Sequence, residues 1–192
     1  PNVRLYASKY PEEVSGMVLV DSSHEDQLQE IPNWPQGFFE KLLTHPNVAP
    51  FWASIGIFRI INHLPTSKAN YKAFSPGIQQ IYLATMSTTK FIRTVSQEHE
   101  KLEQSLKQLK NAGGRLGNKP LIVITAGKSL SSENTGYPRE LTDKFDNLWE
   151  DFQKDLVTKS TNGKRIIAEH SGHMIPHEQP EIIIEAIREV AK

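Results

Sequence analysis

Cysteine is absent from the 192 residues of this sequence, which excludes a disulfide, a thiolate metal site and a cysteine nucleophile. The 22 basic and 22 acidic residues cancel, and a chain without net charge has no overall field that attracts nucleic acid or an anionic membrane. No apolar run reaches the ~20 residues of a membrane span, since Arg59 interrupts the nearest approach, residues 49–61. We therefore expect a soluble protein with no membrane span and no nucleic-acid partner. The lack of cysteine is compatible with a cytoplasmic location.

Hydrophobic residues make up 38% of the chain, enough for the core of a globular domain, and their spacing predicts an α/β fold. The predicted elements are strands at 17–20, 121–126 and 165–169, and helices at 1–10, 88–110, 141–156 and 180–192. Strands that alternate with long helices favour right-handed crossovers and hence a parallel sheet. Three strands make a narrow sheet with unpaired apolar edges, so a partner that supplies the remaining strands is expected.

The segment between the first two predicted strands has a different character. Proline and aromatic residues punctuate it, and its apolar spacing predicts short helices at 38–43, 51–61 and 78–86 before the long helix. We therefore predict a mostly helical insertion at 22–114, placed between two sheet-forming segments, 1–21 and 115–192.

Residues 164–181, K-R-I-I-A-E-H-S-G-H-M-I-P-H-E-Q-P-E, predict a strand, a Ser-Gly turn with His173 at its tip, and a helix that begins at Pro180. An imidazole on a short turn suits acid–base chemistry because its pKa lies near neutrality. His170 and His177 flank it, but the Ser-Gly turn and a proline break the helix that an H-E-x-x-H zinc site needs. No metal site is expected here.

Two stretches of the sequence resemble the α/β-hydrolase family. R-L-Y-A-S-K-Y-P-E-E-V-S-G-M-V-L-V-D is similar to the helix and strand that follow the family's nucleophile elbow, and S-G-H-M-I-P-H-E-Q-P-E-I-I-I-E-A-I is similar to its histidine loop and last helix. The resemblance implies the C-terminal part of a hydrolase sheet, with 22–114 as the lid over the active site. It implies no metal and no organic cofactor.

The resemblance also implies a catalytic base and an acid. His173 lies where the family carries the base that takes a proton from the nucleophile. Asp21 ends the first strand, where a parallel sheet places catalytic groups and where some members carry the acid. Others carry it after the next strand, which here ends T-A-G-K-S without a carboxylate, so Glu133, Asp143 or Asp146 would act only through a longer loop. Asp21 is the expected acid.

No G-x-S-x-G occurs in the sequence, although the chain order of the family is serine, acid, histidine. S-T-T-K at 87–90 matches S-x-x-K but has no S-D-N or K-T-G companion. The resemblance therefore implies that the nucleophile lies outside this chain, in a longer polypeptide or in a separate chain that holds the N-terminal half. By itself, this chain is expected to be inactive.

The function implied by the resemblance is a serine hydrolase that cleaves an ester or related bond of a small, apolar substrate. Epoxide hydrolase, dehalogenase or haloperoxidase chemistry uses the same scaffold, and a non-catalytic protein that binds a ligand or a partner is a further alternative. Aromatic side chains are frequent in the predicted lid, and apolar pockets are lined by such residues. The candidates for a substrate pocket are Trp34, Phe38 and Trp52, together with His24 after the first strand; packing of the lid against the sheet is the structural alternative.

Overall fold

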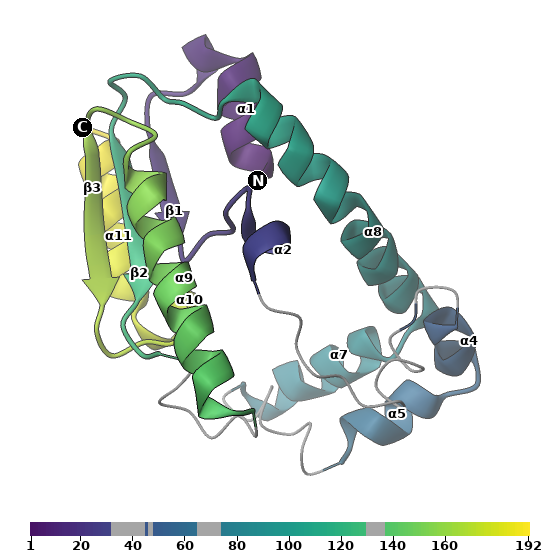
Figure 1. The fold of residues 1–192 in the computed structure, drawn as a ribbon. Coiled ribbons are helices and arrows are strands. Elements are labelled where there is room, and N and C mark those ends of the chain that lie inside the picture. The colour runs from purple at the N-terminus through teal and green to yellow at the C-terminus, as the bar shows by residue number, and fades with distance from the viewer. Residues whose placement is uncertain (32–44, 46–47, 65–73, 130–136) are drawn as a thin grey trace. The chain divides into compact units, whose positions relative to one another are not determined.

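The computed structural model describes residues 1–31, 45, 48–64, 74–129 and 137–192. Within these residues the chain is a mixed α/β protein (Figure 1). No helix in the described ranges is long and apolar enough to cross a membrane. The elements in chain order are α1 (Asn2–Lys9), η1 (Pro11–Glu13), β1 (Met17–Val20), α2 (Gln27–Glu30), α4 (Ala49–Ser54), α5 (Ile57–Asn62), α7 (Pro76–Met86), α8 (Thr89–Ala112), β2 (Leu121–Ala126), α9 (Arg139–Val157), β3 (Gly163–Ala168), α10 (Ile175–Glu178) and α11 (Pro180–Val190).

The chain divides into two compact units. The first contains Pro1–Asn33 and Glu103–Lys192, and the second is Trp34–Leu102. Helix α8 begins in the second unit and ends in the first. The second unit falls inside the segment 22–114 that the sequence assigns to a helical lid, and the strands all belong to the first unit.

The three strands form one parallel sheet in the order β1-β2-β3, so β2 is the central strand. In the register, Val18 pairs with Ile122, which in turn pairs with Lys164. Parallel strands bring their carboxyl ends to one edge, so the loops that follow the three strands meet there. The predicted α/β class and the parallel three-stranded sheet are confirmed.

Helices cover both faces of this sheet (Figure 1). On one face, side chains of α1 and α9 pack with Leu121 and Val123 of β2. On the other face, α11 packs over Ile122 and Ile124. All four β2 side chains are at most 2% exposed, and burying an aliphatic side chain of this size contributes roughly 1.5–3 kcal/mol. The continuous apolar run of β2 is therefore explained by helices on both sides.

Two predicted elements differ from the structure. The helix predicted at 51–61 is two helices, α4 and α5, because Gly56 takes a φ of +84° between them. This left-handed conformation is accessible to glycine and interrupts the helical hydrogen-bond ladder. The strand predicted at 165–169 instead runs from Gly163 to Ala168. The helix predicted at 38–43 lies outside the described residues.

Contacts inside the second unit tie its short helices together. The side-chain amide of Asn62 donates a hydrogen bond of 3.0 Å to the hydroxyl of Ser87, which donates one of 2.7 Å to the carbonyl of Leu83. The rings of Phe51 and Trp52 pack edge to face, with 5.2 Å between their centroids. The polar contacts thus join α5 to the end of α7, and the ring contact lies within α4.

Candidate active site

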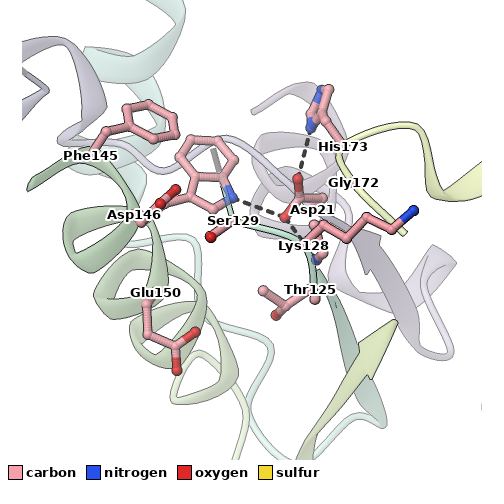
Figure 2. Close-up of a pocket in the computed structure, with 12 residues that line it drawn as sticks. Asp21, Thr125, Lys128, Ser129, Phe145, Asp146, Glu150, Gly172 and His173 are labelled. Carbon is pink, nitrogen blue, oxygen red and sulfur yellow. Dashed lines mark hydrogen bonds and ion pairs between the residues drawn. The ribbon is translucent and has the colours of Figure 1, made fainter. Parts of the chain in front are cut away.

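Asp21 and His173, the acid and base implied by the resemblance, are hydrogen-bonded to each other at the carboxyl edge of the sheet. Asp21 directly follows β1, and His173 lies between β3 and α10, 152 positions later in the chain. Nδ1 of His173 lies 2.7 Å from Oδ2 of Asp21 (Figure 2). This is the distance of a strong hydrogen bond, in which the N–H donates to a charged carboxylate.

The carboxylate of Asp21 is held by further donors. Asp21 is only 4% exposed, and a buried charge is costly unless hydrogen bonds compensate it. Oδ1 accepts hydrogen bonds from Nε1 of Trp149 at 2.9 Å and from the backbone N–H of Ala126 at 3.3 Å (Figure 2). The backbone N–H of Asp21 donates to the carbonyl of Ile124 at 2.7 Å. Both carboxylate oxygens therefore have fixed partners.

Asp21 also has a strained backbone. Its φ is +40°, a left-handed value that no other non-glycine residue in the described ranges adopts. This conformation costs a side-chain-bearing residue on the order of 1–2 kcal/mol. Such strain persists where the surrounding contacts over-determine the geometry, and it concentrates at functional sites. The turn after β1 is thus a position at which contacts outweigh backbone preference.

His173 differs from its partner in exposure. Its side chain is 73% exposed, whereas that of Asp21 is 4% exposed. The hydrogen bond to Asp21 raises the pKa of His173, and partial burial opposes this rise without cancelling it. Within the described residues Nε2 makes no hydrogen bond. The site therefore presents an imidazole that is oriented through one nitrogen and able to accept a proton at the other.

Backbone and side-chain hydrogen bonds fix the loop that carries His173. The carbonyl of Ser171, a fully buried residue, accepts hydrogen bonds of 3.0 Å from the N–H groups of Gly127 and Lys128. From the other side, Oε2 of Glu178 accepts the N–H of Gly172 at 2.8 Å and the hydroxyl of Ser171 at 3.0 Å. These donors lower the pKa of Glu178. The carboxylate thus stays charged and keeps the turn closed.

Gly127 permits the close approach of the two loops. A Cβ atom at this position would lie 2.5 Å from the Cα atom of Glu169 and 2.7 Å from the carbonyl oxygen of Ala168. Both are backbone atoms, which cannot move aside as the end of a flexible side chain can. The loops after β2 and β3 meet closely because this residue has no side chain, and that contact places His173 over the end of β1.

A cavity of about 450 Å³ adjoins the pair. Its volume lies within the range of small-molecule sites. Its lining includes the rings of Phe145 and Trp149 on α9 and the charged side chains of Lys128, Asp146 and Glu150; Figure 2 shows the residues that line it. The lining residues are Asp21, Thr125, Ala126, Gly127, Lys128, Ser129, Phe145, Asp146, Trp149, Glu150, Gly172 and His173.

The alternative acids lie in other places. Asp146 lines the cavity, on α9. Asp143 is half exposed, and its carboxylate lies 3.8 Å from the Nε atom of Arg139 in the first turn of the same helix. Glu133 lies outside the described residues. Among the described carboxylates, Asp21 is the one that hydrogen-bonds to His173.

The substrate-pocket candidates are scattered. His24 is 4% exposed, and its ring stacks on Phe152 with 4.4 Å between centroids. It is not among the residues that line the cavity beside Asp21. Trp52 is half-buried in the second unit, and its indole nitrogen has no hydrogen-bond partner in the described residues. Trp34 and Phe38 lie outside the described residues.

His24 belongs instead to a cluster of ionisable side chains, three of them buried and two partly exposed, which we call the ion-pair cluster: Arg4, His24, Glu25, Asp155 and Lys159. Glu25 pairs with Arg4 at 2.6 Å and with Lys159 at 3.0 Å. Asp155 pairs with Lys159 at 2.7 Å and with His24 at 2.9 Å. Burial raises the pKa of Glu25, but the hydrogen bonds from Arg4 and Lys159 outweigh it and hold that pKa well below its usual range. The cluster ties α1 and α9 to the segment after β1.

Three members of the ion-pair cluster offer potential metal ligands. Atoms of His24, Glu25 and Asp155 lie within 4.8 Å of one another. However, the guanidinium of Arg4 and the ammonium of Lys159 already contact the two carboxylates. Two cations neutralise two anions, so we interpret the cluster as an ion-pair network and propose no metal site there.

Sequence reasoning missed three residues that shape the site. Trp149 falls within the helix predicted at 141–156, where an aromatic residue is typical of core packing, but an indole also carries an N–H that needs an acceptor when buried. Glu178 has no role among the predictions from the sequence, although it lies close enough in sequence to reach back to the Ser-Gly turn. The third, Gly127, was taken as the end of a strand. A glycine directly between a strand and a polar loop was the available signal for a close backbone approach.

No family model matches this chain. Over 94 residues it is 31% identical to the uncharacterized protein YqjL of Bacillus subtilis (strain 168), a match that covers 48% of this chain and 32% of that protein. The chain therefore matches about a third of the length of this relative.

Proposed function

We propose that this chain supplies the acid and base of a serine-type α/β-hydrolase that cleaves an ester or related bond in a small, apolar substrate. The observation that carries the proposal is the 2.7 Å hydrogen bond between His173 and Asp21. These residues come from loops at the carboxyl edge of a parallel sheet, which is where α/β folds place catalytic groups.

In this mechanism, Nε2 of His173 takes the proton of a serine hydroxyl as the serine oxygen attacks the carbonyl carbon of the ester. The imidazolium then gives that proton to the leaving alkoxide as its bond to carbon breaks, and an acyl-enzyme forms. Water then attacks the acyl-enzyme while His173 takes its proton, and the carboxylic acid product is released as the serine oxygen regains a proton from the imidazolium. Throughout, Asp21 keeps the proton of His173 on Nδ1 and stabilises the imidazolium, while remaining ionised itself.

The nucleophile in this proposal comes from residues outside the 192, since the sequence contains no G-x-S-x-G. β1 lies at an edge of the described sheet, and Met17 and Leu19 on this strand are already buried in the core. An edge strand of this kind offers unpaired backbone groups to a further strand. A strand added there would end beside Asp21, within the same row of carboxyl ends.

The direct test compares this chain with an assembly in which the nucleophile-bearing segment is supplied, using p-nitrophenyl esters of short acyl chains. The proposal expects no turnover by the 192 residues alone, and turnover by the assembly that His173→Ala abolishes. Lys164→Met, at an exposed ion pair with Glu189, is the matched control and should keep activity. Turnover by the chain alone that disappears in His173→Ala would contradict an external nucleophile.

The chemistry of the missing nucleophile separates the related reactions. A serine indicates acyl transfer, whereas an aspartate at the same place indicates the alkyl-enzyme route of epoxide hydrolases and dehalogenases. An assembly without any nucleophile at that position would instead favour the non-catalytic binding protein. A covalent label that reacts with activated serines, followed by mass spectrometry of the assembly, distinguishes a serine nucleophile from the other two outcomes.

A further inference from the structure

We propose that Trp149 is a positioning residue for the Asp21–His173 pair: its indole N–H holds Oδ1 of Asp21 so that Oδ2 faces the imidazole. The geometric part of this inference stands on the contacts alone. Its consequence for catalysis rests on the proposed function.

The hydrogen bond from Trp149 is the stronger of the two that reach Oδ1. Nε1 of the indole lies 2.9 Å from this oxygen, whereas the N–H of Ala126 lies at 3.3 Å. A carboxylate can rotate about its Cβ–Cγ bond, and a donor fixed on one oxygen stops that rotation. Without the indole donor, Oδ1 would keep only the longer contact, and Oδ2 would no longer be constrained to face Nδ1 of His173.

The same face of α9 also holds the backbone beside Asp21. Gln153 lies one helical turn after Trp149 and is fully buried. Its side-chain Nε2 donates a 2.9 Å hydrogen bond to the carbonyl of Ser22. The side chains of Trp149 and Gln153 therefore hold the carboxylate of Asp21 and the carbonyl of Ser22. Both contacts lie at the residue whose φ is +40° or directly after it. This paired contact explains how the strained turn after β1 is kept in place.

An ion pair anchors α9 at the level of Trp149. The guanidinium of Arg165, on β3, donates to both carboxylate oxygens of Glu150, one of them at 2.6 Å. Nε of Arg165 also donates to the hydroxyl of Thr125 on β2 at 3.0 Å. A two-pronged contact of this kind fixes orientation as well as distance. The helix is thus tied to β3 at the residue that follows Trp149, through an arginine that is itself held by β2.

Neighbouring rings restrict the indole itself. The ring of Phe145 stacks on it, with 5.6 Å between centroids and 13° between the planes. The ring of His173 meets it edge to face, at 6.5 Å and 78°. The indole therefore contacts the acid through its N–H and the base through its ring, from a single side chain.

The test follows the titration of His173 in the 192-residue chain by ¹H–¹⁵N NMR of its ring nitrogens. We expect Trp149→Phe to lower the pKa of His173 toward its ordinary value, by at least half of the change that Asp21→Asn produces. Phe145→Leu removes a packed ring but leaves the indole N–H in place, so it should leave most of the raised pKa intact. A purely structural role for Trp149 predicts instead that Trp149→Phe and Phe145→Leu shift the titration equally, which would overturn the proposal.

A second readout needs no change at Trp149. A hydrogen bond to a carboxylate moves the indole N–H proton of Trp149 downfield, so Asp21→Asn should move its resonance upfield while the indole resonance of Trp52 stays unchanged. An unchanged resonance would overturn the proposal even if Trp149→Phe fails to fold. The ester assay separates this inference from the function: an inactive assembly with both NMR effects intact contradicts the hydrolase alone.

Discussion

Two histidine–aspartate pairs in the first unit have similar nitrogen–oxygen distances, but the exposed partner is the histidine in one pair and the aspartate in the other. Nδ1 of His173 lies 2.7 Å from Asp21, and Nε2 of His24 lies 2.9 Å from Asp155. In the first pair the histidine side chain is 73% exposed and the aspartate is buried; in the second the histidine side chain is 6% exposed and that of the aspartate 45%. Exposure, rather than the pairing itself, determines whether an imidazole can exchange a proton with a bound molecule.

Charge compensation differs in the same way. Asp21 receives one indole N–H and one backbone N–H besides its histidine. Asp155 and Glu25 share the ammonium of Lys159, and Glu25 also has Arg4. The ion-pair cluster thus resembles a structural tie that holds two helices to the end of β1. In the first pair the further side-chain and backbone donors reach the aspartate, and Nε2 of His173 makes no hydrogen bond within the described residues.

Substitution of the two histidines should separate these pairs most strongly. In an assembly with ester turnover, His173→Ala should lower kcat by about 10⁶-fold, as for removal of a base in a catalytic triad, while the free energy of unfolding changes by no more than ~1 kcal/mol. His24→Ala should leave kcat of the folded protein nearly unchanged. It should lower the free energy of unfolding by ~2–3 kcal/mol, because a buried ring and its hydrogen bond disappear.

Urea denaturation and initial rates measure both effects on the same preparations. A large loss of stability in His173→Ala, with kcat intact in the folded fraction, would reverse the assignment of the two pairs. His170→Ala, an exposed neighbour in the same loop, serves as the control that should change neither quantity.

The ion-pair cluster should be the more sensitive region for stability. Glu25→Gln leaves Arg4, only 2% exposed, without its counter-charge, and Lys159 with only Asp155. Removing one partner of a buried pair typically costs 3–5 kcal/mol, and we expect about 3 kcal/mol in urea denaturation. The matched control is Lys164→Met: Lys164 and Glu189 are both more than half exposed, so its loss should cost less than ~0.5 kcal/mol. If Glu25→Gln and Lys164→Met lowered the free energy of unfolding equally, the result would contradict the burial of Glu25 and Arg4.

Gly127→Ala tests whether close backbone approach holds the histidine loop. The added methyl would overlap backbone atoms of Ala168 and Glu169, and overpacking of this kind costs about 1–3 kcal/mol. The His173 resonances should move, whereas those of His24 should change little. Gly77→Ala is the control, because nothing lies within 4 Å of its Cβ position and alanine is the better helix former. A tolerated Gly127→Ala with unchanged His173 resonances would contradict this role.

The smallest expected effect is the pH dependence of the exposed pair. Because the folded protein raises the pKa of His173, the imidazolium–carboxylate contact stabilises the fold fully below the unfolded value of ~6.5 and fades as pH rises through the folded pKa. Ester turnover should instead increase over that rise, since the base must be neutral. Both trends should weaken in Asp21→Asn, as followed by urea midpoints and kcat between pH 5 and 9. Turnover that falls with pH across this window would contradict a neutral base.

The elements of the sheet were accessible from the sequence, but part of the site was not. The strands at 17–20 and 121–126 were predicted with the bounds that the structure has, because short apolar runs ended by polar or glycine residues carry their own signal. The break in helix 51–61 at Gly56 was missed, because a single glycine is often tolerated inside a helix and only its φ of +84° shows the break.

For the site, the order of motifs along the chain indicated Asp21 and His173, and the rule for parallel sheets placed Asp21 at the proper edge. Nothing local indicated Trp149, because an indole in an apolar stripe is read as core. Its N–H finds an acceptor only when α9 packs beside the end of β1. For His24 the outcome was the reverse. Its sequence position close to Asp21 suggested a pocket residue, whereas its ring packs on Phe152 and pairs with Asp155.

The sequence by itself determined the alternation of strands and helices and the apolar faces that cover the sheet, since each depends on spacing within a few turns of chain. Asp21 and His173 were candidates because of the resemblance to a family. Only the tertiary structure decided which carboxylate meets His173, which histidine is buried, and which helix fixes the acid. Those contacts join residues more than a hundred positions apart. These contacts form only where the packing of helices and strands brings a donor next to an acceptor, and the local spacing of residues does not predict that packing.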